Sequence, residues 1–397
     1  MDKPSEKVVI VDSKRTPIGQ YLGSLSSLSA PELGAHAISA LFSSLPIELH
    51  EVDEVIMGCV LSASLGQAPA RQASIGAKLP ISVGATTVNK MCGSGMKAMM
   101  IAYDQLLVAP SSIIVAGGME SMSNAPYLLM GARQGYRMGH NTVYDHMFLD
   151  GLEDAYDKGK LMGVFAEQCA QKYQLTREAQ DSFALESLRM AQQAAQKSLF
   201  KNEIVPIHIT NKMGSVDIVH DELPDKAKPE KIPTLKPAFK ENGSVTAANS
   251  SAISDGAAAH LMMTQSEAKR RGIKPLATIV AHRSHAQEPA LFTTAPIAAI
   301  EKVIAAANWK IEDVDLFEIN EAFAVVTLAA MQALNIPRDK VNIHGGACAL
   351  GHPIGASGAR IVSTLIYALK ERGLKKGVAA LCIGGGEATA MAIQVDE

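Results

Sequence analysis

The sequence predicts an α/β fold built from two similar halves and an irregular insertion. Short β-branched runs alternate with longer Ala-rich amphipathic segments, as in KVVIVDS, then APELGAHAISALFSSL, then VDEVIMGCV. The outer parts of the chain repeat one pattern, and the region from about Pro126 to Phe239 departs from it. Alternation of this kind is typical of mostly parallel strands that are buried on both faces.

The internal repeat joins three segments in each half. In the first half, VDEV is followed by TTVNKMCGSGMKAM and SSIIVAGGMES; in the second, VDLF is followed by VNIHGGACALGHPIGASGARI and GVAALCIGGGEATAM. Each half therefore offers a strand, a strand whose Gly-rich turn opens a helix, and a strand that ends in clustered glycines. If the halves pack about a pseudo-twofold axis, their Gly turns meet at one central cleft.

The middle region has the composition of an excursion from this repeat. It holds a Pro- and Lys-rich stretch, DELPDKAKPEKIPTLKPAF, and one strong amphipathic segment, LTREAQDSFALESLRMAQQAAQKSLF. Thr176 stands before acidic residues and before apolar residues spaced i, i+3 and i+4. The pattern predicts a surface helix with Thr176 as its N-cap.

Composition excludes several function classes. The chain has 397 residues, 47% of them apolar, and a net charge of -3, so no global charge favours nucleic acid or anionic lipid. No run approaches about 18 apolar residues, which predicts no membrane span. Five scattered cysteines without a CxxC pair predict neither a disulfide framework nor a structural metal site. A strand follows within seven residues of the first, so we expect no targeting signal and a cytoplasmic location.

Cys92 is the first candidate for chemistry. It lies between a strand-like TTVNKM run and the helix predicted for GSGMKAMMIAYDQLL. Unpaired N–H groups and the positive helix end favour a thiolate there, which is a good nucleophile. Backbone N–H groups in the Gly turn can also stabilise an oxyanion, for about 3 kcal/mol per donor. The alternative is a buried core cysteine, which the Gly-rich strand-to-helix setting disfavours.

Three further side chains complete a candidate site. His352, held between Gly351 and Pro353, is suited to accept the Cys92 proton. Cys382 ends an apolar strand, and the glycines after it supply bare N–H groups; its alternative is a tight strand-to-turn connection. Asn320 follows a strand and can hold a water or a carbonyl oxygen, or else serve as a helix N-cap, with Glu321 as a partner of the helix dipole.

At this point the motifs resemble one family, the thiolases, and within it the acetyl-CoA C-acetyltransferases. The resemblance runs nearly end to end and rests on KRTPIG, GQAPARQA, VNKMCGSGMKA, GGMESMSNAP, VTAANSSAISDGAAA, NEAFA, GGACALGHPIGASGARI and LCIGGGEA. It implies a five-layered αβαβα fold of two similar domains plus an inserted loop domain. The expected bounds are 1–122 with 248–272 for the N-terminal domain, 123–247 for the loop domain and 273–397 for the C-terminal domain.

The resemblance also implies roles. Cys92 would be the acylated nucleophile, His352 its base, and Cys382 the acid and base of the second step. Asn320 would hold a water beside His352, and the N–H groups of Cys92 and Gly384 would form an oxyanion hole. The substrates would be acetyl-CoA, acetoacetyl-CoA and CoA, without a metal or other cofactor, in a homodimer or homotetramer. The residues expected to bind substrate are Ser251, Met162, Phe323, Lys226, Lys228 and Lys231.

Three departures from the family pattern qualify this expectation. Leu161 stands where short-chain members often have histidine, which leaves the acyl chain length open. Pro224 occupies a region where relatives place an arginine near the nucleotide, so the three lysines that follow would supply charge to the phosphates. Cys348 and His344 vary positions that often hold asparagine and an aliphatic residue, and neither receives a catalytic role.

The same motifs leave three alternative functions. One is a 3-ketoacyl-CoA thiolase of broader chain length. Another is a ketoacyl synthase, which typically lacks the second cysteine that stands here at Cys382. The third is a non-catalytic lipid-binding relative, against which the presence of all four polar groups argues.

Overall fold

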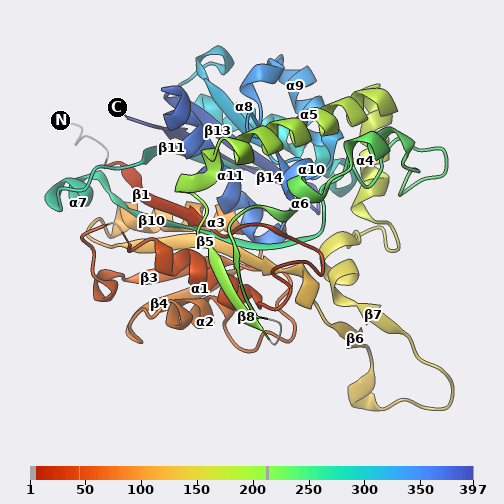
Figure 1. The fold of residues 1–397 in the computed structure, drawn as a ribbon, viewed down its shortest axis with the longest axis horizontal. Helices are drawn as coiled ribbons and strands as arrows, with labels where there is room; N and C mark the ends of the chain where they lie inside the picture. Colours follow the sequence, from red (N-terminus) through yellow and green to blue (C-terminus); the bar gives the residue numbers. More distant parts are fainter. Residues whose placement is uncertain (1–5, 44, 212–213, 397) are drawn as a thin grey trace.

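A computed structural model describes residues 6–43, 45–211 and 214–396, and its centre is a large mixed sheet (Figure 1). The first half of the sheet has the strand order β4-β3-β5-β10-β1. β3 is parallel to β4 and β5, whereas β10 is antiparallel to β5 and β1. The strands are β1 (Val8–Arg15), β3 (Glu54–Gly58), β4 (Gly84–Val88), β5 (Ile114–Ser121) and β10 (Ser254–Thr264), with the short β2 (Gly19–Gln20) paired to β10.

The second half of the sheet repeats this order. β12 is parallel to β13, and β14 is antiparallel to both β13 and β11. On the other side of β12, Val341 forms a parallel bridge to Phe317, in the place that β4 takes beside β3. The strands are β11 (Ala277–Ala286), β12 (Leu316–Ile319), β13 (Lys376–Ile383) and β14 (Glu387–Gln394). The repeat predicted from the sequence is therefore seen as the same strand order and the same strand directions in both halves.

The helices and the two halves of the sheet form five layers. The central helices α3 and α11 share one apolar cluster with strand residues from both halves of the sheet. α1 and α2 cover the outer face of the first half, and α8 and α9 cover that of the second. These helices are α1 (Ala30–Ala40), α2 (Pro69–Gly76), α3 (Ser94–Val108), α8 (Ala295–Ala306), α9 (Ala324–Leu334) and α11 (Ile354–Arg372). The predicted αβαβα arrangement is confirmed.

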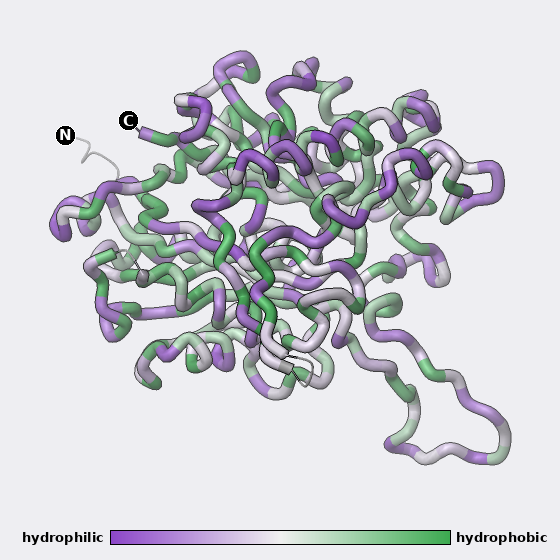
Figure 2. Tube along the Cα trace, viewed as in Figure 1, coloured by the Kyte–Doolittle hydropathy of each residue, from purple (hydrophilic) through white to green (hydrophobic). Residues whose placement is uncertain are grey.

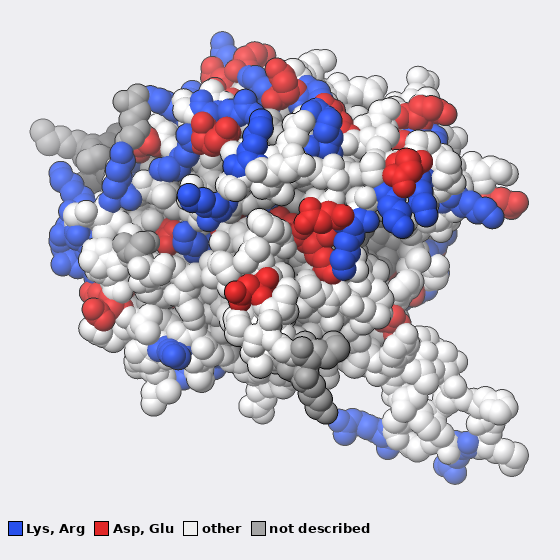
Figure 3. Space-filling model, in the orientation of Figure 1, with Lys and Arg blue, Asp and Glu red and all other residues white. Residues whose placement is uncertain are grey.

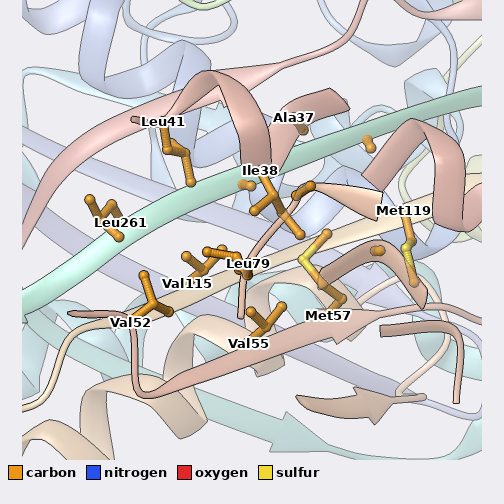
Figure 4. Close-up of a cluster of buried hydrophobic side chains, with 14 of the residues drawn as sticks. Ala37, Ile38, Leu41, Val52, Val55, Met57, Leu79, Val115, Met119 and Leu261 are labelled. Atoms are coloured by element: carbon orange, nitrogen blue, oxygen red, sulfur yellow. The ribbon is translucent and has the colours of Figure 1, made fainter. Parts of the chain in front are cut away.

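The run of apolar residues in β1 reflects this burial on both faces. Val9 and Val11 belong to the outer cluster beneath α1, whereas Val8 and Ile10 belong to the central one. Figure 4 shows the outer cluster, where Ile38 of α1 and Leu41, the C-cap residue of this helix, lie near strand side chains such as Val115. Along the chain, hydrophobic segments concentrate in the middle of the molecule (Figure 2).

Glycine lets the central helices approach the sheet and each other. A Cβ on Gly118 in β5 would lie 2.0 Å from the carbonyl oxygen of Gly355 in α11. A Cβ on Gly95 in α3 would lie 2.9 Å from the backbone nitrogen of Ala359. Both contacts are closer than any side chain permits, so these glycines are required by packing between the two halves.

The insertion folds over one edge of the sheet and extends an arm. The arm is the hairpin of β6 and β7, which projects from the body in Figure 1. Thr176 caps α5 by accepting a hydrogen bond from the backbone N–H of Ala179 (3.2 Å), as predicted. The helices and strands here are β6 (Tyr127–Leu129), β7 (Val143–Asp145), η4 (Phe148–Leu152), α4 (Met162–Lys172), α5 (Arg177–Gln196), β8 (Ile207–Asn211), β9 (Gly214–Ile218) and α6 (Glu222–Lys226).

Short helices connect the remaining segments. They are η1 (Leu49–Glu51), η2 (Met122–Asn124), η3 (Ala132–Gln134), η5 (Leu199–Asn202), η6 (Pro229–Thr234), α7 (Gln265–Arg270), η7 (Pro289–Thr294), η8 (Ile311–Asp313), η9 (Arg338–Lys340) and α10 (Ala347–Leu350).

A buried cluster of charged side chains links the insertion to β1. The Arg15 guanidinium is fully buried and pairs with Glu203 (2.9 Å) and Asp221 (2.7 Å). A buried guanidinium is tolerated only with such partners, because an isolated charge in the interior is costly. Asp221 also accepts the backbone N–H of Ile18 (2.8 Å), so the same carboxylate fixes the chain that leaves β1.

One apolar stretch bears on the prediction about membranes. The stretch Pro289–Ala306, which continues from η7 into α8, is long and apolar enough by composition to cross a membrane. Half of it is buried inside the fold, where Ile300 and Val303 of α8 pack on the second half of the sheet. A core helix passes the same test of length and composition, and these contacts are those of a core helix.

Acid is expected to destabilise the fold through His260. Burial in β10 lowers the pKa of His260 from 6.5 to about 4, and its Nε2 lies 3.1 Å from the carbonyl oxygen of Ala359. In the unfolded chain His260 therefore binds a proton below about pH 6.5, whereas in the folded chain it does so only below about pH 4. The free energy of unfolding should fall by about 3 kcal/mol through this group between pH 7 and 4.

The comparison that isolates this effect is His260→Gln, which keeps a donor for Ala359 but does not titrate. Urea unfolding from pH 7 to 4 should show a steeper loss of stability in the wild type than in the variant. The exposed His50→Gln is the control and should follow the wild type. Parallel curves for wild type and His260→Gln would contradict the assignment.

Candidate active site

One cavity of about 860 Å³ gathers the predicted site residues. Cys92 lies in the turn between β4 and α3, His352 lies between α10 and α11, and Cys382 lies at the end of β13. All three line the cavity, as does Gly384. The chain brings them together because the carboxyl ends of strands from both halves meet at this edge of the molecule.

Cys92 carries a neutral thiol at rest. Burial raises its pKa to about 11, although the backbone N–H groups of Gly384 and of Cys92 itself pull the pKa down. The thiolate expected from the sequence is therefore not the resting form, because desolvation outweighs these donors. The two N–H groups nevertheless converge at the sulfur, which is the geometry required to hold an oxyanion next to it.

His352 is fixed in one tautomer. Its Nδ1 lies 2.5 Å from Ser357 Oγ, and that hydroxyl donates to the carbonyl oxygen of Pro353 (3.0 Å). The hydroxyl hydrogen is thus engaged, so Nδ1 carries the imidazole proton and Nε2 keeps its lone pair. Burial and the positive charge of Arg360 lower the pKa of His352 to about 3. The imidazole is neutral at pH 7, with Nε2 available as a base.

Ser357 was not predicted from the sequence, and its loss should be costly. In Ser357→Ala the Nδ1–H loses its partner, and the neutral ring can adopt the wrong tautomer. We expect the turnover number to fall by about 10- to 100-fold, the equivalent of one unsatisfied buried donor, with KM nearly unchanged. Ser357→Thr should retain much of the rate, and equal loss in both variants would contradict this role. Steady-state kinetics measures the difference.

Cys382 is a buried thiol, which can both give and take a proton. It lies among apolar side chains that include Phe165, Phe292 and Phe323. Burial and the proximity of Cys92 raise the pKa of the Cys382 thiol well above its ordinary value. It is therefore protonated at rest, and its thiolate would be a strong base once formed.

Asn320 faces His352 with an amide that has spare hydrogen-bonding capacity. Its Nδ2 lies 3.5 Å from His352 Nε2, and its buried Oδ1 has no partner. A buried amide with a free acceptor is suited to hold a small polar group next to the imidazole. The alternative of a helix N-cap is not seen, because α9 begins at Ala324 and Phe323 occupies the N-cap.

Glu321 has a structural role. It precedes α9, so it is not the first-turn dipole partner that the sequence suggested. Its carboxylate instead accepts hydrogen bonds from Ser187 Oγ (2.8 Å), Asn342 Nδ2 (2.8 Å) and the backbone N–H of Cys348 (3.1 Å). These bonds hold the segment that leads to His352.

The residues expected to bind substrate divide into two groups. Ser251, Met162 and Phe323 line the cavity, and so does Leu161. The three predicted lysines lie elsewhere, and Lys226 pairs with Glu222 (2.5 Å). Among the described residues that line the cavity, Lys158 is the one lysine. The role of the three lysines stays a prediction.

Glu120 is a second residue that sequence reasoning missed. It is fully buried in β5 and accepts backbone N–H groups of Leu61 (3.1 Å), Val60 (3.1 Å) and Gly355 (2.9 Å). It therefore joins the loop after β3 to the first turn of α11, next to His352. Burial raises the pKa of Glu120 to about 7. The sequence feature that could have indicated Glu120 is the presence of an acidic residue in the otherwise apolar strand that contains GGMES.

A nucleophilic thiol, a base, a second thiol and paired N–H groups define an acyl-transfer enzyme that works through a cysteine intermediate. Among residues 6–43, 45–211 and 214–396, no group of three or more His, Cys, Asp or Glu side chains is placed to hold a metal ion. The five cysteines are free thiols.

Comparison with known proteins identifies the family. The model of the thiolase N-terminal domain matches residues 8–266, and that of the thiolase C-terminal domain matches residues 273–395. The chain belongs to the thiolase family.

Individual relatives match over the full length. The chain is 50% identical to acetyl-CoA acetyltransferase 2 of Arabidopsis thaliana over 98% of this chain and 97% of that protein. It is 46% identical to an acetyl-CoA acetyltransferase of Cupriavidus necator over 98% and 99% of the two chains. The crystal structure of the Bacillus anthracis acetyl-CoA acetyltransferase superposes with a TM-score of 0.96 at 40% identity and covers 99% of both chains.

Proposed function

We propose that this enzyme is an acetyl-CoA C-acetyltransferase, which condenses two acetyl-CoA molecules to acetoacetyl-CoA and CoA or runs the reverse thiolysis. The observation that carries the proposal is the convergence of Cys92, His352 and Cys382 in one cavity. The names of the full-length relatives support the choice of substrate.

The first half-reaction acylates Cys92. The thiol gives its proton to His352 Nε2 as sulfur attacks the thioester carbonyl of acetyl-CoA. An isolated thiolate or imidazolium is unfavourable in this buried site. When the two form together, their mutual attraction stabilises both. The N–H groups of Cys92 and Gly384 hold the tetrahedral oxyanion. Collapse breaks the carbon–sulfur bond to CoA, and Cys382 protonates the departing thiolate.

The second half-reaction forms the carbon–carbon bond. The Cys382 thiolate takes a proton from the α-carbon of a second acetyl-CoA. The enolate oxygen is stabilised by protonated His352 and by a water held on Asn320. The carbanion attacks the acetyl group on Cys92, and the thiolate of Cys92 leaves. Because the thioester itself acidifies the α-carbon, we propose that neither a metal nor a redox cofactor takes part.

Acyl chain length is the finer question. Leu161 lines the cavity together with Phe148, Leu149 and Met162, so the wall near the acyl end is apolar. This lining supports the second candidate, a thiolase that also accepts longer 3-oxoacyl-CoA substrates.

The proposal is tested by following loss of acetoacetyl-CoA absorbance with free CoA. The same assay with malonyl-CoA and with longer 3-oxoacyl-CoA separates the candidates. Thiolysis of acetoacetyl-CoA alone supports the first function, and thiolysis of longer substrates supports the second. Decarboxylation of malonyl-CoA would indicate a ketoacyl synthase, and no turnover of any substrate would indicate a binding protein.

We also propose self-association through the arm of β6 and β7, as a homotetramer or homodimer, in the reducing cytoplasm. The arm exposes Tyr127, Leu129, Met130 and Met138, and Met138 is fully exposed. Residues 127–144 contain no acidic side chain, and Figure 3 shows positive charge at the end of the arm. Exposed apolar patches of this kind are typical of protein interfaces. Sedimentation equilibrium measures the mass of the assembly.

A further inference from the structure

The nucleophile turn and the glycine turn after Cys382 are joined by an ion pair. Lys90 Nζ lies 2.5 Å from Glu387 Oε2, with side-chain exposures of 21% and 34%. Lys90 comes two residues before Cys92, and Glu387 comes three residues after Gly384. The pair therefore connects the two halves of the molecule directly beside the two N–H groups that converge on Cys92.

On the Lys90 side, the backbone is held tightly. The N–H of Lys90 donates to Ser94 Oγ (2.8 Å), and the N–H of Gly93 donates to the carbonyl oxygen of Lys90 (3.0 Å). Met91 has a φ of 46°, which is strained for a residue with a side chain. Any movement of Lys90 is thus passed to Cys92 through a rigid turn.

On the Glu387 side, the turn is equally constrained. Glu387 opens β14 and is paired with Ile383 of β13 and with Ala286 of β11. Gly385 and Gly386 have φ values of 93° and 85°, so the backbone between Gly384 and Glu387 depends on glycine. The two turns also touch, since a Cβ on Gly93 would lie 2.4 Å from Ile383 Cδ1.

We propose that Lys90 and Glu387 are positioning residues that hold the N–H of Gly384 against Cys92, and so build the oxyanion hole across the boundary between the two halves. Neither side chain lines the cavity, so neither touches substrate. The inference rests on the proposed thiolase chemistry, in which this N–H stabilises the oxyanion. The ion pair therefore adds a direct link between the two turns to the packing of Gly93 against Ile383.

Breaking the pair should lower turnover more than binding. In Lys90→Gln and in Glu387→Gln we expect kcat to fall by about 10-fold, because a small displacement of one oxyanion donor costs part of the 10²- to 10³-fold that its removal costs. KM for CoA should stay within about twofold, since the pair lies outside the cavity. The double variant Lys90→Glu with Glu387→Lys reverses the polarity and should recover most of the lost rate.

Alkylation of Cys92 gives a readout that needs no CoA substrate. The N–H of Gly384 favours the thiolate, so its displacement should shift the pH profile of iodoacetamide alkylation to higher pH. Peptide mass spectrometry follows Cys92 separately from the other thiols. His352, Cys382 and Glu120 also face this thiol and are unchanged in these variants. Lys90→Gln removes a positive charge and Glu387→Gln removes a negative one, so their direct effects on ionisation of the Cys92 thiol have opposite signs. A shift to higher pH in both variants therefore reports the Gly384 donor.

The matched control is Glu186→Gln. Glu186 pairs with Arg338 at 2.9 Å with exposures of 36% and 21%, and neither residue lines the cavity. It should lower thermal stability about as much as the single variants while leaving kcat and alkylation unchanged. Normal alkylation in Lys90→Gln and Glu387→Gln, or no recovery in the double variant, would overturn the inference. If the wild type has no thiolase activity but the variants show the predicted alkylation shifts, the proposed function is contradicted and the positioning role of the ion pair is not.

Discussion

Cys92→Ser is expected to lose about 10⁴-fold or more in thiolysis rate, the scale on which removal of a covalent nucleophile is felt. Serine preserves the size and position of the side chain but not its nucleophilicity. Its hydroxyl is far less acidic than the thiol, whose pKa is already raised to about 11 by burial. The ion pair with protonated His352, which makes ionisation of the thiol possible, is not sufficient to ionise the less acidic hydroxyl.

The measurement combines turnover with direct detection of the intermediate. Incubation of the wild type with acetyl-CoA should add one acetyl group to the peptide that contains Cys92, and the variant should add none. Cys348→Ala is the control, because that thiol makes only a weak contact with the carbonyl oxygen of Glu321 (3.7 Å) and does not line the cavity. Acetylation of a different residue, or substantial turnover by Cys92→Ser, would show that the nucleophile is elsewhere.

The sequence was informative about these thiols because glycine-rich turns at strand ends have few possible structures. The repeated strand, turn and helix predicted both the duplicated topology and the meeting of Cys92 with His352 and Cys382. Each of these residues stands next to glycines that the packing demands, such as Gly95 and Gly355. Local pattern and tertiary arrangement agree here, which is why the site could be assembled from motifs.

What the sequence could not predict depends on distances between remote segments. Whether burial or N–H donors control the Cys92 thiol depends on how completely the two halves exclude water. The tautomer of His352 depends on the rotamer of Ser357. Glu120 acts on backbone groups of two loops that are far apart in the chain. Lys158 lines the cavity because it lies in the segment between η4 and α4, both of which contribute to the cavity wall. No sequence motif indicates that lysine.

Cys382→Ser should separate the two half-reactions. Cys92, His352 and the N–H of Gly384 remain in place, and a thiolate can leave without first taking a proton. Acetylation of Cys92 by acetyl-CoA should therefore proceed to close to the wild-type extent. Condensation should fall by about 10²- to 10⁴-fold, which is the contribution of a positioned acid and base. A buried serine hydroxyl cannot ionise to take a proton from the α-carbon. The Cys382 thiol, although its pKa is raised, becomes a thiolate when it gives its proton to the departing CoA thiolate.

Burst kinetics of CoA release from acetyl-CoA measures the first step, and formation of acetoacetyl-CoA measures the second. Cys169→Ser is the control because Cys169 is a buried thiol in the same apolar cluster as Cys382 but does not line the cavity. It should cost stability and leave the ratio of the two steps unchanged. An equal burst with normal condensation in Cys382→Ser would transfer the acid and base role to another group. Loss of the burst itself would mean that CoA cannot depart without the proton from Cys382, because acylation would then stall before the carbon–sulfur bond breaks.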